Sequence, residues 1–268
     1  MAQTSSRIST ILPASSRTAL GATVATGLLT ALASAPDRMS RLLRHRYPMV
    51  AVTGMTGVGK SQLVDRLTRR STDDAVAEVG SAVMERRTRK AANLHGFRFL
   101  VVPGDNAATR LGALDEVFHD EPVDGVLHVV AWGHATPRRT GGTTGAALAT
   151  RDELLAAELE DWAITAHRIA SMAVRRDRPT WLVVAVTKAD LFAGDVDAAV
   201  HYYSPGSGTP FGDKLDELRA LAGGARLSID VLPVCARGGD KRSAMPEKAC
   251  GELLGRLELR LAQLSGHV

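Results

Sequence analysis

A glycine-rich loop between a short apolar strand and an amphipathic helix limits the folds open to this chain more than any other feature of its sequence. A strand is predicted at Met49 to Thr53, the loop runs from Gly54 to Ser61, and the helix continues through Leu67. Glycines permit backbone angles and a close approach that a Cβ would prevent, so successive N–H groups and the helix N-terminus can surround phosphate oxygens. The sequence therefore predicts a phosphate-binding loop (P-loop).

The residue types in this loop assign individual roles. Lys60 is expected to reach the β and γ phosphates and to act in catalysis, and Ser61 to place its hydroxyl on Mg²⁺. A chance glycine turn is the alternative, which the flanking strand and helix disfavour. The residues predicted to hold the phosphates are Gly54, Gly57, Val58, Gly59, Lys60, Ser61 and Gln62.

Short apolar strands alternate with helical stretches from Met49 onward. This alternation is typical of a three-layer α/β fold with a mainly parallel sheet of about six strands. The predicted strands are Met49 to Thr53, Phe97 to Val102, Gly125 to Ala131, Trp181 to Thr187 and Ser228 to Val234, with a less clear one near Arg89 to Leu94.

Helices are predicted from capping and from apolar periodicity. Thr150 and Glu153 form a capping box before a helix over Arg151 to Arg175, whose apolar stripe from Leu155 to Ile169 belongs to the core. A further helix is expected at Ala107 to Phe118, and leucines after Cys250 give the last helix its buried face.

The tetrapeptide Thr187-Lys188-Ala189-Asp190 follows a predicted strand and resembles the Asn/Thr-Lys-x-Asp guanine-specificity motif of the P-loop GTPases of the Ras-like and Era-like, translation-factor-related class. Asp190 can accept two hydrogen bonds from guanine, whereas adenine would leave the carboxylate unpaired. The resemblance implies that Lys188 lies along the base plane and that Thr187 stands where Asn is more frequent. Lys and Asp are also common turn residues, so the position after a P-loop carries this assignment.

Two further segments follow the same resemblance. Cys235-Ala236-Arg237 looks like the Ser-Ala-Lys loop whose backbone contacts the guanine, so Cys235 and Ala236 are predicted to bind the base. Val101-Val102-Pro103-Gly104 matches the Asp-x-Pro-Gly form of the third motif except that Val101 replaces the Asp, so this motif is degenerate. Asp105 is a candidate for the missing carboxylate or for positioning the attacking water; a cap on the following helix is the alternative.

The resemblance also implies a switch segment between Arg70 and Leu94, with a Thr that closes over Mg²⁺ and the γ-phosphate. Thr88 is predicted to be this metal ligand and catalytic residue, with Thr72 in reserve. The residues around Thr88 form a basic run, for which a solvated charged face is the alternative. The long segment Gly133 to Ala149 is expected to be a lid, a partner-binding loop or a flexible loop, and its Arg138 or Arg139 could act as an arginine finger.

Residues 1–47 are predicted to be an N-terminal extension, and residues 48–268 the G domain. Thr18 to Pro36 has no charged residue, and an arginine-rich patch follows it up to Arg46. A helix packing on a partner or an interface is one interpretation, a membrane anchor a second and a cleaved signal peptide the least favoured, so membrane association through residues 18–46 stays open.

Charge and cysteine content exclude few function classes. The net charge of +4 is spread over many arginine clusters, so no specific nucleic-acid partner is indicated. The two cysteines, Cys235 and Cys250, lack metal-ligand spacing and fit a reducing compartment as buried thiols, so we expect a cytoplasmic protein.

The sequence thus predicts a guanine-nucleotide-binding protein that uses GTP, GDP and Mg²⁺. The resemblance implies a GTPase that acts as a molecular switch toward a protein effector or regulator. A GTP-binding scaffold with little hydrolysis is one alternative, favoured by Val101, and an ATP-dependent P-loop enzyme is another, disfavoured by Asp190.

Overall fold

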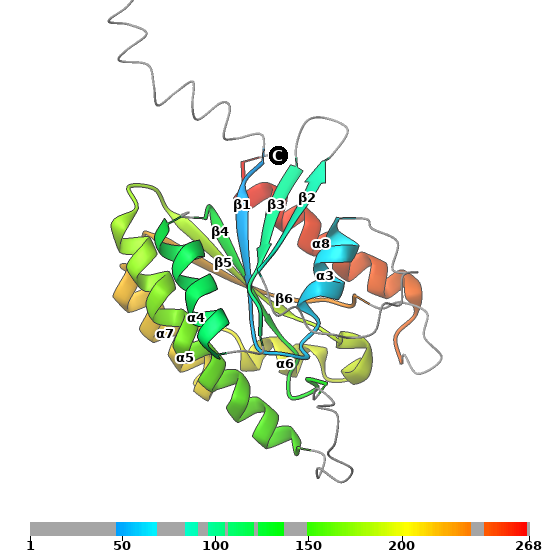
Figure 1. Ribbon diagram of the computed structural model, residues 1–268. Helices are drawn as coiled ribbons and strands as arrows, with labels where there is room; N and C mark the ends of the chain where they lie inside the picture. The colour runs from blue at the N-terminus through cyan, green and yellow to red at the C-terminus, as the bar shows by residue number, and fades with distance from the viewer. Residues whose placement is uncertain are drawn as a thin grey trace, which may run out of the picture. The chain divides into compact units, whose positions relative to one another are not determined.

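The computed structural model describes residues 47–68, 84–90, 96–104, 107–120, 123–136, 149–236 and 244–266. In these residues the strands form one six-stranded sheet in the order β2-β3-β1-β4-β5-β6 (Figure 1). Neighbouring strands are parallel except for β2, which pairs antiparallel with β3. The strands are β1 (Met49–Thr53), β2 (Glu85–Lys90), β3 (Gly96–Val101), β4 (Gly125–Val130), β5 (Thr180–Val186) and β6 (Leu227–Pro233).

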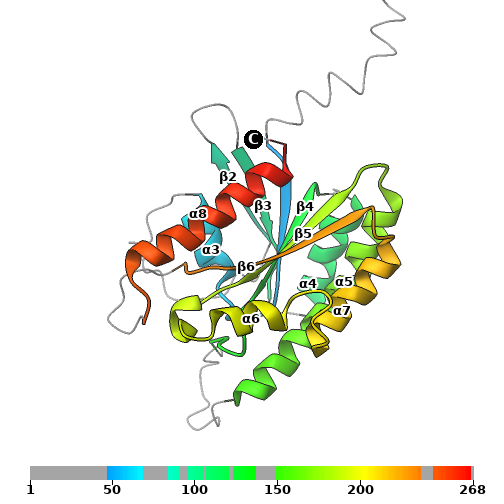
Figure 2. The ribbon, with the colours of Figure 1, turned by 180° about the vertical axis from the view of Figure 1, so that it is seen from behind.

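Helices cover both faces of this sheet. The helices α4, α5 and α7 lie on one face, and α3 and α8 lie on the other (Figures 1 and 2). Because successive strand residues point to opposite faces, Ala51 joins the core under α4 and α5 while its neighbours Val50 and Val52 join the core under α3 and α8. The helices are α3 (Lys60–Leu67), α4 (Ala107–Asp115), α5 (Arg151–Arg175), α6 (Val196–Tyr202), α7 (Pro210–Ala222) and α8 (Glu247–Leu264).

The parallel strands bring several loops to one edge of the sheet. The strand β1 lies between β3 and β4, and β5 and β6 follow outward from β4. Since all five run in the same direction, the segments after their carboxyl ends meet at this edge, which is where ligands bind in open α/β sheets. We call it the carboxyl edge.

The predicted parallel strands are confirmed to within one residue at each end, and the helix Arg151–Arg175 has the predicted bounds. Its capping box is present: the Glu153 N–H donates to the Thr150 hydroxyl over 3.3 Å, and the Thr150 N–H donates to Glu153 Oε2 over 2.7 Å. The helix expected at Ala107 to Phe118 is α-helical only to Asp115 and ends in a π-helical turn, Glu116–Asp120.

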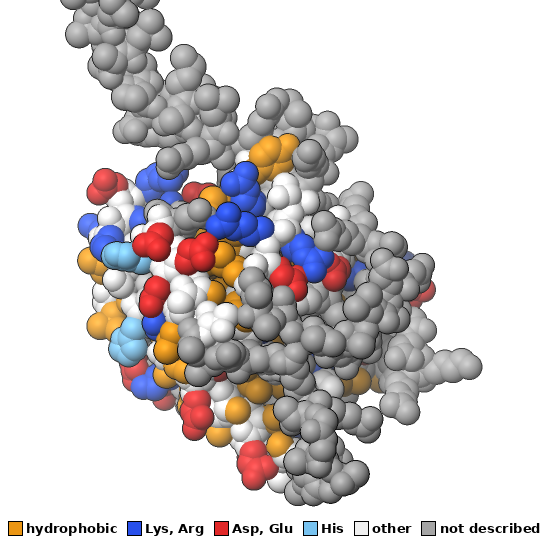
Figure 3. Space-filling model, viewed as in Figure 1, with side chains coloured by type: hydrophobic (Ala, Val, Ile, Leu, Met, Phe, Trp, Pro, Cys, Tyr) orange, Lys and Arg blue, Asp and Glu red, His pale blue; other side chains and the backbone are white. Residues whose placement is uncertain are grey.

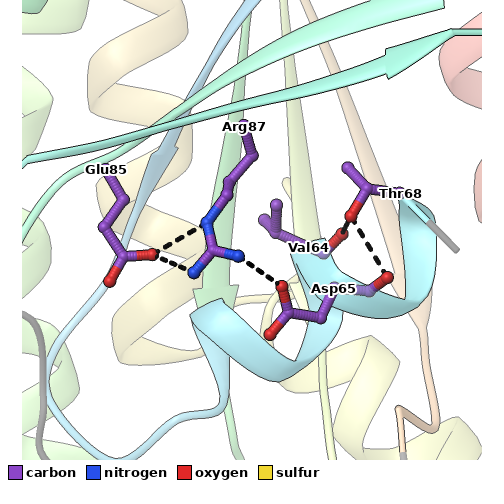
Figure 4. Close-up of polar contacts among 5 residues, drawn as sticks. All are labelled: Val64, Asp65, Thr68, Glu85 and Arg87. Atoms are coloured by element: carbon purple, nitrogen blue, oxygen red, sulfur yellow. Dashed lines mark hydrogen bonds and ion pairs between the residues drawn. The ribbon is translucent and has the colours of Figure 1, made fainter. Parts of the chain in front are cut away.

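The sixth strand differs from the prediction, because it spans Glu85–Lys90 instead of Arg89 to Leu94. The strand has no apolar pattern because most of its residues are charged. Charged residues are tolerated in an edge strand, where they prevent pairing with the strands of other chains. Arg87 joins this strand to α3: its guanidinium lies 2.6 Å from Glu85 Oε2 and 2.9 Å from Asp65 Oδ1 (Figure 4).

The predicted N-terminal extension lies outside the described residues, apart from Tyr47, so its helix and its membrane association stay predictions. Within the described ranges, no helix combines the length and the apolar character that crossing a membrane requires.

Candidate nucleotide-binding site

The loop after β1 has the backbone that its glycines predict. Gly54, Gly57 and Gly59 have φ of 127°, 81° and 98°, in the region that favours glycine. A Cβ at Gly54 would lie 2.2 Å from the Val129 carbonyl oxygen, and one at Gly57 would lie 2.0 Å from the Thr136 carbonyl oxygen. Close backbone packing, as well as torsion, therefore requires glycine at these two positions.

Lys60 is the first residue of α3 and folds back over the loop. Its side-chain Nζ donates to the carbonyl oxygens of Gly54 and Met55, at 2.6 Å and 2.9 Å. Burial lowers the pKa of Lys60 from 10.5 to about 8; the charge of Asp161 opposes this shift and that of Arg110 adds to it. The buried ammonium group is thus bonded to carbonyl oxygens of the loop, and the partly buried Ser61 follows it in the sequence.

The segment after β5 is bonded to the P-loop. The Thr187 hydroxyl lies 2.5 Å from the Val58 carbonyl oxygen and 2.9 Å from that of Val130. The Lys188 Nζ donates to the Gly57 carbonyl over 2.8 Å, and also to the His134 carbonyl and the Thr136 hydroxyl, both over 2.7 Å. Two segments about 130 residues apart in the sequence are thus joined at the carboxyl edge.

Asp190 and Cys235 meet at the ends of β5 and β6. Asp190 is 8% exposed, and the Cys235 Sγ donates to its Oδ1 over 3.4 Å. Burial, followed by the neighbouring Cys250 and Asp190, raises the pKa of the Cys235 thiol, which stays a protonated donor. Cys235 and Cys250 are buried and form no disulfide, and Ala236, which follows Cys235, is partly buried.

In the degenerate third motif, the backbone at Gly104 lies beside the P-loop, and Val101 occupies the position of the usual carboxylate. Val101 is 3% exposed and packs in the core under α3 and α8. A Cβ at Gly104 would lie 2.6 Å from the Thr56 hydroxyl and 2.9 Å from the Lys60 Nζ, so this turn passes directly beside the lysine. Asp105 lies outside the described residues, and its predicted role stays a prediction.

The structure does not bring Thr88 to this site. Thr88 was expected in a switch loop but lies exposed in β2, where it pairs with Arg98. Arg98 in turn pairs with Met49 at the start of β1, whereas the P-loop follows Thr53, roughly 13 Å further along the strand. The basic run around Thr88 belongs to an edge strand, which corrects its predicted position. Thr72 lies outside the described residues.

The turn after β4 is bonded to Glu158 of α5, to Tyr203 and to the P-loop, and the sequence did not predict these contacts. The Ala131 N–H donates to Glu158 Oε1 over 2.9 Å, and the Trp132 N–H donates to the Tyr203 hydroxyl over 3.1 Å. Tyr203 itself donates to Glu158. The Thr136 N–H then donates to the Gly57 carbonyl over 3.0 Å. Of the predicted lid, residues 137–148, including Arg138 and Arg139, lie outside the described residues.

A group of buried polar side chains, which we call the buried polar cluster, lies under α4 and α5 next to Lys60. Arg110 of α4 pairs with Asp161 of α5 at 2.5 Å, and Thr53 Oγ1 lies 2.9 Å from His128 Nδ1. Sequence analysis missed these residues. The one available signal was the pair of acidic residues, Glu158 and Asp161, between the apolar positions of the α5 stripe. The cluster consists of Thr53, Lys60, Arg110, His128 and Asp161.

Charged side chains on the outer surface of α4 and α5 alternate in sign (Figure 3). One example is the pair Arg168–Asp115, which joins α5 to α4 at 2.8 Å. Among the described residues, no group of three or more His, Cys, Asp or Glu side chains could hold a metal ion by itself.

Neither a scan against protein-family models nor a search of the curated proteins gives a match. Similar solved structures include that of the mammalian SRP receptor, with 15% identity, a TM-score of 0.51 and coverage of 81% of this chain and 99% of that chain. A signal recognition particle receptor SRb-GTP/SRX complex from Chaetomium thermophilum has 12% identity, a TM-score of 0.49 and coverage of 78% and 99%. Toc33 from Arabidopsis thaliana has 14% identity, a TM-score of 0.43 and coverage of 82% and 84%.

At this identity the likeness to the mammalian receptor shows the fold alone. Together with the observed sheet, it confirms the predicted three-layer α/β fold of the P-loop G-domain type. It does not single out the Ras-like or Era-like branch that the sequence motifs resemble.

Proposed function

We propose that this chain binds guanine nucleotides with Mg²⁺ and hydrolyses GTP as a molecular switch. The observation that carries the proposal is the junction between the P-loop and the guanine-type motif. The Lys188 side chain donates a hydrogen bond to the Gly57 carbonyl, and the Thr187 hydroxyl donates one to the Val58 carbonyl. Asp190 follows Lys188 by two positions in the sequence. These hydrogen bonds join the predicted phosphate-binding loop to the segment that carries the predicted guanine-binding carboxylate, which supports the proposal.

The roles of the individual residues follow from their chemistry. The P-loop N–H groups and Lys60 would bind the phosphates, and Ser61 would be a ligand of Mg²⁺. The metal would neutralise charge that develops on the transferred phosphoryl group. Asp190 would read the base, with the stem of Lys188 beside it and the loop at Cys235 and Ala236 around it.

The buried Val101 favours a second candidate, a GTP-binding scaffold with little hydrolysis. Where a GTPase of the resembled class carries a carboxylate for the Mg²⁺ water shell, this chain carries a valine that is 3% exposed. The two functions share the nucleotide site and differ only in the rate of phosphate release.

Affinities for GTP, GDP and ATP, measured by calorimetry with Mg²⁺ and nucleotide-free protein, test the nucleotide assignment. Asp190→Ala should weaken GTP binding about 100-fold, since two charge-assisted hydrogen bonds are lost. Asp197→Ala, which removes an exposed carboxylate from α6, should leave the affinity unchanged. A preference for ATP, or equal GTP affinity in both variants, would defeat the proposal.

Phosphate release from GTP, timed with and without Mg²⁺, separates the two candidates. Slow release that candidate partners do not accelerate would favour the scaffold over the switch.

We also propose that residues 18–46 recruit the protein to membranes toward its partner. Fractionation of cells that express the full chain or residues 48–268 tests this, and equal distribution of both forms would contradict it.

A further inference from the structure

The buried polar cluster holds two cationic side chains and one carboxylate, and the buried carboxyl group of Glu158 lies one turn of α5 before that carboxylate. The cluster contains the Lys60 ammonium and the Arg110 guanidinium, with the Asp161 carboxylate as the anion. Burial, followed by the charges of Arg110 and Lys60, lowers the pKa of His128 to about 3, so its ring is neutral near pH 7. Two cationic groups near each other in a buried site favour the binding of an anion there.

Arg110 lies on the element that begins beside the P-loop lysine. The helix α4 starts at Ala107, shortly after the Gly104 backbone that packs against the Lys60 Nζ. Arg110 stands in the second turn of this helix and turns inward, with 11% of its side chain exposed. Burial raises the pKa of the Asp161 carboxyl group, and the charges of Arg110 and Lys60 both act to lower it, so both cations lie near this one carboxylate.

The bond that holds Arg110 is incomplete. The Arg110 Nη2 lies 2.5 Å from Asp161 Oδ1 and 3.5 Å from the Asp161 backbone carbonyl. Among the described residues, however, Asp161 Oδ2 has no hydrogen-bond partner, and neither has the indole N–H of the adjacent Trp162. Asp161 is only 5% exposed. A buried ion pair with unused hydrogen-bonding capacity contributes little stability.

We propose that Arg110 is a second cation for the terminal phosphate of the bound nucleotide, and that Asp161 holds its guanidinium between rounds of binding. This inference rests on the proposed function and names a residue of the same site. The planar fork of a guanidinium matches phosphate oxygens better than an ammonium does. With Val101 in the third motif, no carboxylate at that position competes for the arginine.

The exchange would also couple the γ-phosphate to α4. Arg110 is fixed to this helix, so a guanidinium that leaves Asp161 for the phosphate releases the contact between α4 and α5 at that point. GTP and GDP would then favour different positions of α4.

Dissociation constants for GTP and GDP, measured with Mg²⁺ on the full chain, test this inference in three variants. Arg110→Gln should weaken GTP binding about 10-fold to 100-fold with little effect on GDP. Asp161→Asn should shift the GTP-to-GDP preference the other way, because it releases the arginine. Arg168→Gln is the matched control, since it breaks an ion pair between the same two helices on their exposed side and should leave the ratio unchanged.

The opposite signs distinguish a phosphate ligand from a purely structural ion pair. If Arg110→Gln and Asp161→Asn change the ratio in the same direction, or if neither changes it, the inference is overturned. Should Arg110→Gln fail to fold by circular dichroism, Arg110→Lys, which keeps the charge and loses the fork, must still weaken GTP more than GDP. Wild-type protein that binds neither nucleotide would refute the proposed function itself.

Discussion

Replacing Lys60 with methionine tests whether the P-loop lysine is held at a cost to the fold. Its pKa falls from 10.5 to about 8, chiefly because the side chain is buried, and this corresponds to roughly 3 kcal/mol of destabilisation while the group is charged. Below pH 8 the ammonium is charged in both the folded and the unfolded chain, and the whole penalty applies. Lys60→Met also removes the bonds to the Gly54 and Met55 carbonyls, which offsets part of the gain.

The dependence on pH isolates the burial term. Above about pH 8 the folded wild-type protein releases the Lys60 proton, whereas the unfolded chain keeps it up to about pH 10.5. The unfolded state then binds more protons, so wild-type stability should rise relative to Lys60→Met, by about 2 kcal/mol between about pH 7 and about pH 9.5. Thiols and tyrosines titrate in both proteins and cancel in the difference.

Urea denaturation of nucleotide-free protein at both pH values supplies the measurement. Lys214→Met, which removes a partly exposed lysine of α7 that pairs with Glu217, is the control for the loss of one ammonium group. A difference between wild type and Lys60→Met that stays constant across this range would refute the assignment of a buried, destabilising charge at the P-loop.

Two further substitutions test the packing of the carboxyl edge. Gly57→Ala should destabilise the fold by about 1–3 kcal/mol more than Gly59→Ala in urea denaturation, because both positions have positive φ but only the Gly57 Cβ would collide with the Thr136 carbonyl. Equal losses would show that torsion alone matters. Tyr203→Phe should reduce the unfolding free energy by about 1–3 kcal/mol, since Glu158 loses a buried hydrogen-bond donor. An unchanged denaturation midpoint would contradict this role.

Local sequence signals predicted the features that depend on neighbouring residues. The glycine positions of the P-loop follow from torsion and close approach, and the capping box of α5 follows from the spacing of Thr150 and Glu153. The parallel strands were equally accessible because buried strands read as continuous apolar runs. In each case the residues that determine the structure lie within a few positions of one another.

Features that depend on distant contacts were not accessible in this way. The charged segment that contains Thr88 has no apolar pattern, and only its pairing with β3 makes it a strand. Asp161 reads as an ordinary helix residue until Arg110, 51 positions earlier, is seen beside it. The neighbouring residues of Arg110 and Asp161 in the sequence do not show that these two side chains form an ion pair.

The Gly57 carbonyl shows how these distant contacts could matter for switching. It accepts one hydrogen bond from the Lys188 side chain and one from the Thr136 backbone, so the base-side segment and the turn after β4 share one acceptor on the P-loop. A phosphate that draws the loop N–H groups toward itself would either move this carbonyl or fix its position. Either effect would change the hydrogen bonds that the carbonyl accepts from Lys188 and Thr136. The turn is also bonded to α5 through Glu158, so hydrogen bonds and the short turn connect the P-loop to α5, and a nucleotide bound at the P-loop could act on this helix through them. If Arg110 also exchanges its Asp161 contact for phosphate, nucleotide binding would change the contacts of α5 at two residues, Glu158 and Asp161. Two such changes on one helix would favour a switch between two positions of that helix.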